Sequence, residues 1–156
     1  MLDFANAAAG IGWTPVLLIP GSLATDEVLA MPSPFAGRVF LAMPSMPSDQ
    51  TSAGSAAYRA LANAYHLPGD EMASQLAALC SAKVLTQGLK LAGRSLTRAK
   101  LVAALEGLTD FDTGLMPRIG FGPNCRIGAP GARIVAVDLA GRRFTRVSDW
   151  MSVDVE

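Results

Sequence analysis

The chain has 156 residues, of which 51% are hydrophobic and 17% are charged, and its mean hydropathy is +0.33. This length suits one domain, but the apolar content exceeds what the surface of a small domain requires, which fits a piece of a larger protein. Thirteen basic and thirteen acidic side chains cancel. Because no basic cluster exceeds Arg142-Arg143, the composition argues against a nucleic-acid partner.

Neither a membrane span nor an export signal is expected in these residues. No run of eighteen apolar residues occurs, so the sequence predicts no transmembrane helix. The first thirteen residues contain no lysine or arginine ahead of their apolar side chains, and a secretory signal needs that positive segment.

The first half of the chain alternates helical segments with short apolar strands. The VLLI run lies between Pro15 and Pro20-Gly21, and its lack of alternation predicts a strand covered on both faces, as in a parallel sheet. Prolines on both sides of a second apolar run favour extended connections there. The elements expected in this half are helices at 2–9, 26–31 and 50–65 and strands at 14–20 and 38–43.

The second half begins with the longest expected helix and ends in a hairpin. Small apolar residues form one stripe of that helix, which indicates close packing against a sheet, while its polar stripe should face water. Ser95 or Thr97 is the expected cap of the next helix, and the turn at Ala140-Gly141 joins the hairpin strands. The expected elements are helices at 70–92 and 97–106 and strands at 134–139 and 143–147. The small-residue stripe consists of Ala73, Ala77, Cys80, Val84 and Gly88, and the polar stripe of Lys83, Gln87 and Lys90.

No catalytic or metal-binding motif is present. The sequence lacks G-x-S-x-G and a Walker loop, and His66 is its single histidine, expected at the surface where a helix ends. Asp110 and Asp112 flank a turn, where hydrogen bonds to the backbone explain them better than a metal ion does. Cys80 is expected in the core and Cys125 in a loop; two cysteines with no paired spacing predict neither zinc nor a disulfide framework. We therefore expect no enzyme, no catalytic residue, no cofactor and no metal.

The last third of the chain resembles a known family. It contains LVAALEGL, FDTGL, an aromatic-Gly-Pro-Asn step at Phe121 to Asn124, IVAVDLAGRRF and VSDW. This succession is similar to the C-terminal part of the type I periplasmic substrate-binding proteins of ABC transporters, the branched-chain amino-acid (Leu/Ile/Val) receptor family. Members of that family are more than twice as long, with two α/β lobes joined by three crossings.

The resemblance implies an α/β fold class: a partial type I periplasmic-binding-protein fold, with helices on short parallel strands and a C-terminal antiparallel hairpin. Residues 1–156 would form a single α/β unit, the C-terminal portion of a two-lobed protein whose first lobe is absent. The implied function is non-catalytic capture of an amino acid or related small polar solute, which is passed to an ABC permease from a periplasmic or extracytoplasmic location. Glu71 and Met72 are positional candidates for ligand binding at the cleft edge.

Two readings from other classes stay open at this point. A small stand-alone α/β enzyme would be favoured by a tight pocket that contains Asp110, Asp112 and His66. A structural or interaction subunit would be favoured by a stable symmetric dimer, and the apolar excess also predicts a homo-oligomer formed through an uncovered apolar face.

Overall fold

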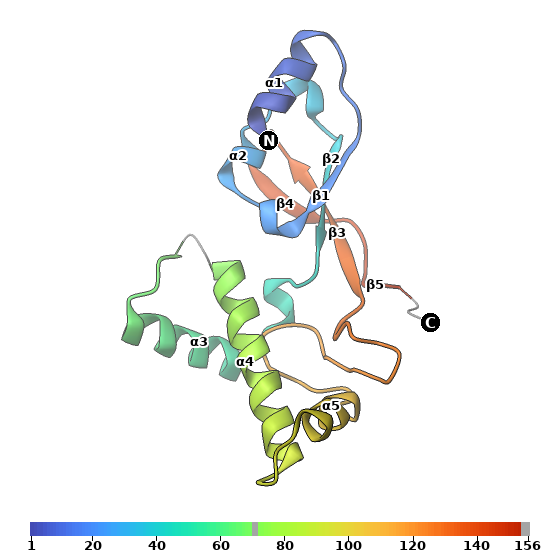
Figure 1. Ribbon diagram of the computed structural model, residues 1–156. Coiled ribbons are helices and arrows are strands. Elements are labelled where there is room, and N and C mark those ends of the chain that lie inside the picture. The colour runs from blue at the N-terminus through green and yellow to red at the C-terminus, as the bar shows by residue number, and fades with distance from the viewer. Residues whose placement is uncertain (70–71, 154–156) are drawn as a thin grey trace. The chain divides into compact units, whose positions relative to one another are not determined.

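The computed structural model describes residues 1–69 and 72–153, which form two compact units (Figure 1). Unit 1 consists of Met1–Pro44 and Gly131–Ser152, and unit 2 consists of Ser45–Pro130 together with Val153. All the strands of the described residues belong to unit 1, whereas the three longest helices that follow Pro44 belong to unit 2.

Unit 1 is built on a mixed sheet with the order β1-β2-β3-β4, in which β5 also pairs with β3. Only β1 and β2 run parallel; β3 pairs antiparallel with β2, β4 and β5. The α/β class and the C-terminal hairpin are therefore as predicted, while most of the sheet is antiparallel. The bounds are β1 Leu17–Pro20, β2 Val39–Met43, β3 Gly131–Asp138, β4 Arg143–Arg146 and β5 Met151–Ser152.

One face of this sheet is buried under two helices and a short turn of helix. The helix α1 (Leu2–Gly10) buries Ala5 and Ala8, and α2 (Asp26–Leu29) buries Val28. In Figure 1 both helices lie on the same side of the strands. Burying each large aliphatic side chain contributes about 1.5–3 kcal/mol, so this layer dominates the stability of unit 1. The buried strand residues are Ile19, Val39, Leu41, Val135 and Val137, and Phe35 and Met31 close the layer.

The other face of the sheet corrects the expectation that the VLLI strand is covered on both sides. Val16 and Leu18 are 62% and 63% exposed, while Ile19 is buried. Residues of a strand point alternately to opposite faces, so the strand has a single covered face among the described residues. An apolar run without alternation was consistent with two covered faces, but the part of the chain that the structure describes covers only one of them.

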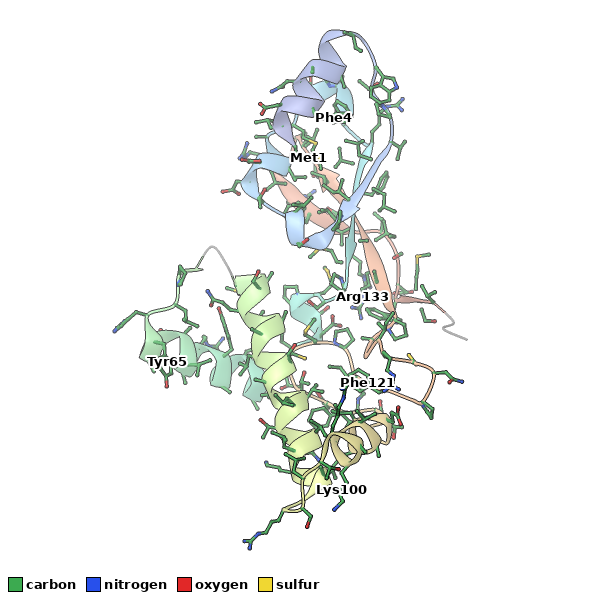
Figure 2. All side chains as sticks on the ribbon, in the orientation of Figure 1. Met1, Phe4, Tyr65, Lys100, Phe121 and Arg133 are labelled. Atoms are coloured by element: carbon green, nitrogen blue, oxygen red, sulfur yellow. The ribbon has the colours of Figure 1, made fainter. Side chains whose placement is uncertain are left out.

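Unit 2 contains the helices α3 (Ser52–Tyr65), α4 (Met72–Ala92) and α5 (Arg98–Glu106). The hydroxyl of Thr51 accepts a hydrogen bond from Gly54 N–H, and that of Thr97 accepts one from Lys100 N–H. The helices α3 and α5 therefore begin at side-chain caps. At the other end of α3 the side chain of Tyr65 projects outward (Figure 2) and is 71% exposed. Within the described part of the chain, no helix is long and apolar enough to cross a membrane.

The inner face of α4 differs from the predicted stripe. Leu76, Cys80 and Gly88 are buried, but Ala73 and Ala77 are exposed. Lys83 and Gln87, expected in water, are half-buried, because the chain at 111–113 lies over them and the Thr113 carbonyl accepts a 2.7 Å hydrogen bond from Lys83 Nζ. Close packing at Gly88 is confirmed, but its partner is the neighbouring helix α5 and not a sheet: a Cβ there would lie 2.6 Å from Leu105 Cδ2.

Two glycines hold α3 against the loop that follows α5. Gly114 adopts a left-handed conformation with φ 72°, and its carbonyl accepts a 3.0 Å hydrogen bond from Thr51 N–H. A Cβ added to Gly54 would overlap that carbonyl oxygen. Close approach of the two backbones therefore requires glycine at position 54.

Substituting this glycine tests the approach directly. Gly54→Ala should lower the free energy of unfolding of unit 2 by about 2 kcal/mol or more, because the methyl group meets backbone rather than a movable side chain. Urea denaturation followed by helical circular dichroism measures the loss. Gly122→Ala is the matched control, since no heavy atom lies within 4 Å of its added Cβ, and it should change stability by less than about 1 kcal/mol. Equal effects of the two substitutions would disprove the close packing.

The β3–β4 turn is fixed by a single carboxylate. Asp138 accepts a 2.8 Å hydrogen bond from Gly141 N–H and a 2.9 Å bond from Arg143 Nε, while Arg142 takes φ 47° in the turn. The Gly141 amide and then the Arg143 guanidinium stabilise the charged form, so they lower the pKa of Asp138 below its ordinary value.

This shift predicts a pH response of the turn. A carboxyl whose folded pKa is depressed stabilises the folded state above the unfolded pKa, and this contribution is lost as pH falls through the folded pKa. The carboxyl resonance of Asp138 should therefore titrate below the midpoint of an ordinary aspartate. In Arg143→Gln the midpoint should rise only part of the way, because the Gly141 amide remains. A wild-type midpoint at the ordinary value would show that the turn does not hold this carboxylate.

Candidate functional site

A shallow groove of unit 1 lies where β1 and β2 end. Its volume of about 450 Å³ is in the range of small-molecule pockets. In open α/β sheets, ligands bind beyond the carboxyl ends of the parallel strands, and β1 and β2 are the parallel pair here. The groove is lined by Leu18, Ile19, Pro20, Gly21, Ser22, Ala42, Pro44 and Ala132.

The wall of the groove depends on the sequence at the end of β1. Pro20 lacks an N–H and is the last residue of the strand, so pairing stops there. Gly21 is buried, and a Cβ on it would lie 2.8 Å from the Ala42 carbonyl oxygen and 2.5 Å from Met43 Sδ. The step from strand to turn therefore requires glycine, which brings the Pro20–Ser22 backbone against the end of β2.

The chemistry of this groove is mainly apolar. Its side chains are aliphatic except for the hydroxyl of Ser22, and none of the eight lining residues is charged. Such a surface can contact an aliphatic part of a ligand, while backbone groups and one hydroxyl supply hydrogen bonds. Any charged end of a ligand must be met by groups outside this lining.

A second groove, within unit 2, is polar. It lies between α4 and residues 111–113, has a volume of about 430 Å³, and carries Lys83, Gln87 and Lys90. Lys83 already donates to the Thr113 carbonyl. Asp112, at its rim, accepts a 2.7 Å hydrogen bond from Gly114 N–H, which confirms the turn interpretation of that aspartate.

The polar residues weighed as an enzyme site do not come together. Asp110 forms a 2.6 Å ion pair with Arg118 at the surface, and His66 is exposed at the end of α3 with φ 51°. Of these residues only Asp112 lines the groove beside α4. Within residues 1–69 and 72–153, no group of three His, Cys, Asp or Glu side chains could hold a metal ion. The geometry that would have favoured an enzyme is not found there.

The remaining candidates have simple positions. Cys80 is buried as expected and Cys125 lies in a loop, and both thiols are free. Met72, the first residue of α4, is 49% exposed and lines neither groove. Glu71 lies outside the described residues. Sequence reasoning missed the Pro20–Ser22 groove, although the Pro-Gly-Ser step after an apolar strand was a usable signal.

Comparison with known proteins decides the family. The sequence profile of a family described as periplasmic binding protein matches residues 1–142. The chain belongs to this family. Its members capture solutes rather than catalyse reactions, so the assignment argues against an enzyme. The resemblance seen in the last third of the sequence is thereby confirmed.

Solved structures show the same fold over nearly the whole chain. A branched chain amino acid ABC transporter from Thermus thermophilus, solved with bound valine, has a TM-score of 0.71 at 17% identity and covers 99% of this chain. A fatty acid ABC transporter substrate-binding protein from Thermomonospora curvata has a TM-score of 0.66 at 18% identity, also over 99%. An ABC transporter permease from the Pseudomonas fluorescens group has a TM-score of 0.64 at 19% identity over 97%.

The chain spans less than half of these proteins. The matched region covers 44%, 41% and 40% of the three structures, respectively. A comparison with curated protein sequences gives no match. Each of the three similar proteins is therefore more than twice as long as the region that this chain matches.

Proposed function

We propose that this periplasmic binding protein chain is part of the solute-binding component of an ABC-type importer. The observation that carries the proposal is the family match over residues 1–142 together with a fold similarity over 99% of the chain. The complete two-lobed protein, called the parent here, captures a solute between lobes that close on a hinge and delivers it to an ABC permease. Its location is periplasmic or extracytoplasmic.

We assign an amino acid or a related small polar solute to the parent. One similar structure holds valine, and the aliphatic lining of the unit 1 groove suits a side chain of that kind. A fatty acid is the second candidate, since another similar structure is a fatty acid binder and the same lining suits an acyl chain. An amino acid carries an ammonium group that a fatty acid lacks. Binding of an amino acid therefore requires a hydrogen-bond acceptor for this group in the parent.

The division of the parent remains part of the proposal. Residues 1–156 are assigned to its C-terminal portion, and such a portion can contain segments of both lobes, since the family's lobes are joined by three crossings. Glu71 and Met72 stay proposed residues of the cleft edge. Met72 does not line the unit 1 groove, so a contact between Met72 and the solute would be independent of that groove.

The 156-residue chain by itself should bind no amino acid tightly. The unit 1 groove offers no charged side chain, so the ammonium and carboxylate of the solute remain in water. An exposed ion pair contributes only about 0–1 kcal/mol, and micromolar binding requires roughly 8 kcal/mol. Titration calorimetry should show no saturable heat at millimolar valine, leucine, glutamine or decanoate.

The parent is the positive arm of the same experiment. Expressed with the coding sequence upstream of residue 1 in its source genome, it should bind one class of the panel with micromolar affinity or better. Micromolar binding by the isolated chain at concentrations where it is monomeric would place a whole site within 156 residues and contradict the two-lobe proposal. Binding of decanoate but no amino acid by the parent would overturn the solute class alone.

A further inference from the structure

A half-buried lysine of unit 2 has no acidic partner among the described residues. Lys83 lies on the side of α4 that residues 111–113 cover, and its Nζ donates a 2.7 Å hydrogen bond to the Thr113 carbonyl. This contact uses one of the three N–H donors of the ammonium and leaves its charge uncompensated. Lys83 takes part in none of the ion pairs between described residues. Partial burial of an unpaired charge is unfavourable, so a bound anion would stabilise this arrangement.

Two more donors follow on the same side of α4. Gln87 and Lys90 stand four and seven residues after Lys83, so the three side chains form one stripe of the helix, and all of them line the same groove. Lys90 is exposed and, like the Gln87 amide, has no side-chain hydrogen bond or ion pair within the described part of the chain. By helical rise the backbones at 83 and 90 are about 10 Å apart. The groove therefore presents two separate positive charges with a neutral donor between them.

The acidic residue of the groove lining is engaged elsewhere. Asp112 Oδ1 accepts a 2.7 Å hydrogen bond from Gly114 N–H, and Asp112 Oδ2 lies 3.9 Å from Arg118 Nη2. The Arg118 guanidinium thus offsets the charge of this carboxylate, and no ion pair joins Asp112 to Lys83 or Lys90. The net charge at the groove is positive, so a ligand that fits it is negatively charged.

The remaining lining suits a short carbon chain. Leu79, Ala82 and Phe111 contribute apolar surface to the groove, and the Thr86 hydroxyl donates to the Ala82 carbonyl of its own helix. The volume of about 430 Å³ exceeds what an inorganic ion needs and is in the range of small-molecule pockets. Two charges held apart beside apolar side chains match a molecule that carries a carboxylate at each end of an aliphatic chain.

We propose that the groove between α4 and residues 111–113 binds a small dicarboxylate. One carboxylate pairs with Lys83, the other pairs with Lys90, and the carbon chain contacts the apolar side chains of the lining. The groove belongs wholly to unit 2 and shares no lining residue with the unit 1 groove. The inference therefore does not depend on the proposed function, in which a solute is captured between the lobes of the parent.

A matched pair of six-carbon acids tests the site in the 156-residue chain. Adipate carries a carboxylate at each end, whereas hexanoate carries one and can form only one of the two ion pairs. Lys83, Lys90 and Lys100 are all the lysines of the sequence, so NMR of the chain with isotope-labelled lysine follows each of them. Adipate should shift the Lys83 and Lys90 signals along one saturable curve and leave Lys100, on α5, unchanged. Hexanoate should bind at least about fivefold more weakly, because it lacks one ion pair.

Substitution of Lys90 identifies the second carboxylate contact. Lys90→Gln should weaken adipate binding at least about fivefold and should remove the preference for adipate over hexanoate, since neither acid then finds a second ammonium. A purely structural effect would weaken both acids equally. Lys100→Gln is the matched control: Lys100 lines a different groove, between α4 and α5, so both affinities should stay unchanged. Circular dichroism checks that the variants fold, and the wild-type titration does not depend on them.

The inference is wrong if adipate leaves the Lys83 and Lys90 signals unchanged, if hexanoate binds as tightly as adipate, or if Lys100→Gln weakens adipate binding. Inorganic phosphate is a further probe, and an affinity for phosphate equal to that for adipate would reject the dicarboxylate. The titration is run at two chain concentrations, because an affinity that rises with concentration would assign adipate to an interface between copies and reject the groove. Failure of adipate leaves the proposed function intact, since capture of a solute is measured on the parent.

Discussion

The pairing of β2 with β3 is the constraint on which unit 1 depends. It joins Val39–Met43 to Gly131–Asp138, segments separated by the whole of Ser45–Pro130. β3 also pairs with β4 through Val135–Asp138 and with β5 through Gly131 and Ala132. Because the buried face contains Leu41 opposite Val135, both almost fully buried, this long-range pairing and the helical cover form one core. Loss of the β2–β3 pairing would separate β1 and β2 from the other three strands.

Local signals in the sequence were sufficient for most elements. Thr97 caps α5, Gly107 follows its end, and the Ala140-Gly141 turn joins β3 to β4, as predicted. Each of these features is decided within a few residues. The two-residue strand β5 was missed because it is defined by pairing with Gly131 and Ala132 and not by its own composition.

The sequence was less informative where a distant segment decides the environment. Lys83 is half-buried because a loop thirty residues away offers it a carbonyl acceptor, and Gln87 lines the groove beside the same loop. Leu18 is exposed because no described helix covers its face. The groove at Pro20–Ser22 was not predicted because the search sought charged and nucleophilic side chains, and this lining has none. Glycine at 21 and 54 serves close backbone approaches that composition alone does not reveal.

The central claim is that, among the described residues, the sheet of unit 1 is covered on one face only. Sedimentation velocity of the isolated chain, combined with binding of a dye that reports exposed apolar surface, tests it most directly. The account predicts dye binding and a sedimentation coefficient that rises with concentration in the tens of micromolar range, because uncovered apolar patches of this kind associate. A monomer that keeps a constant sedimentation coefficient over that range and binds no dye would contradict the claim and show that the chain is a complete domain.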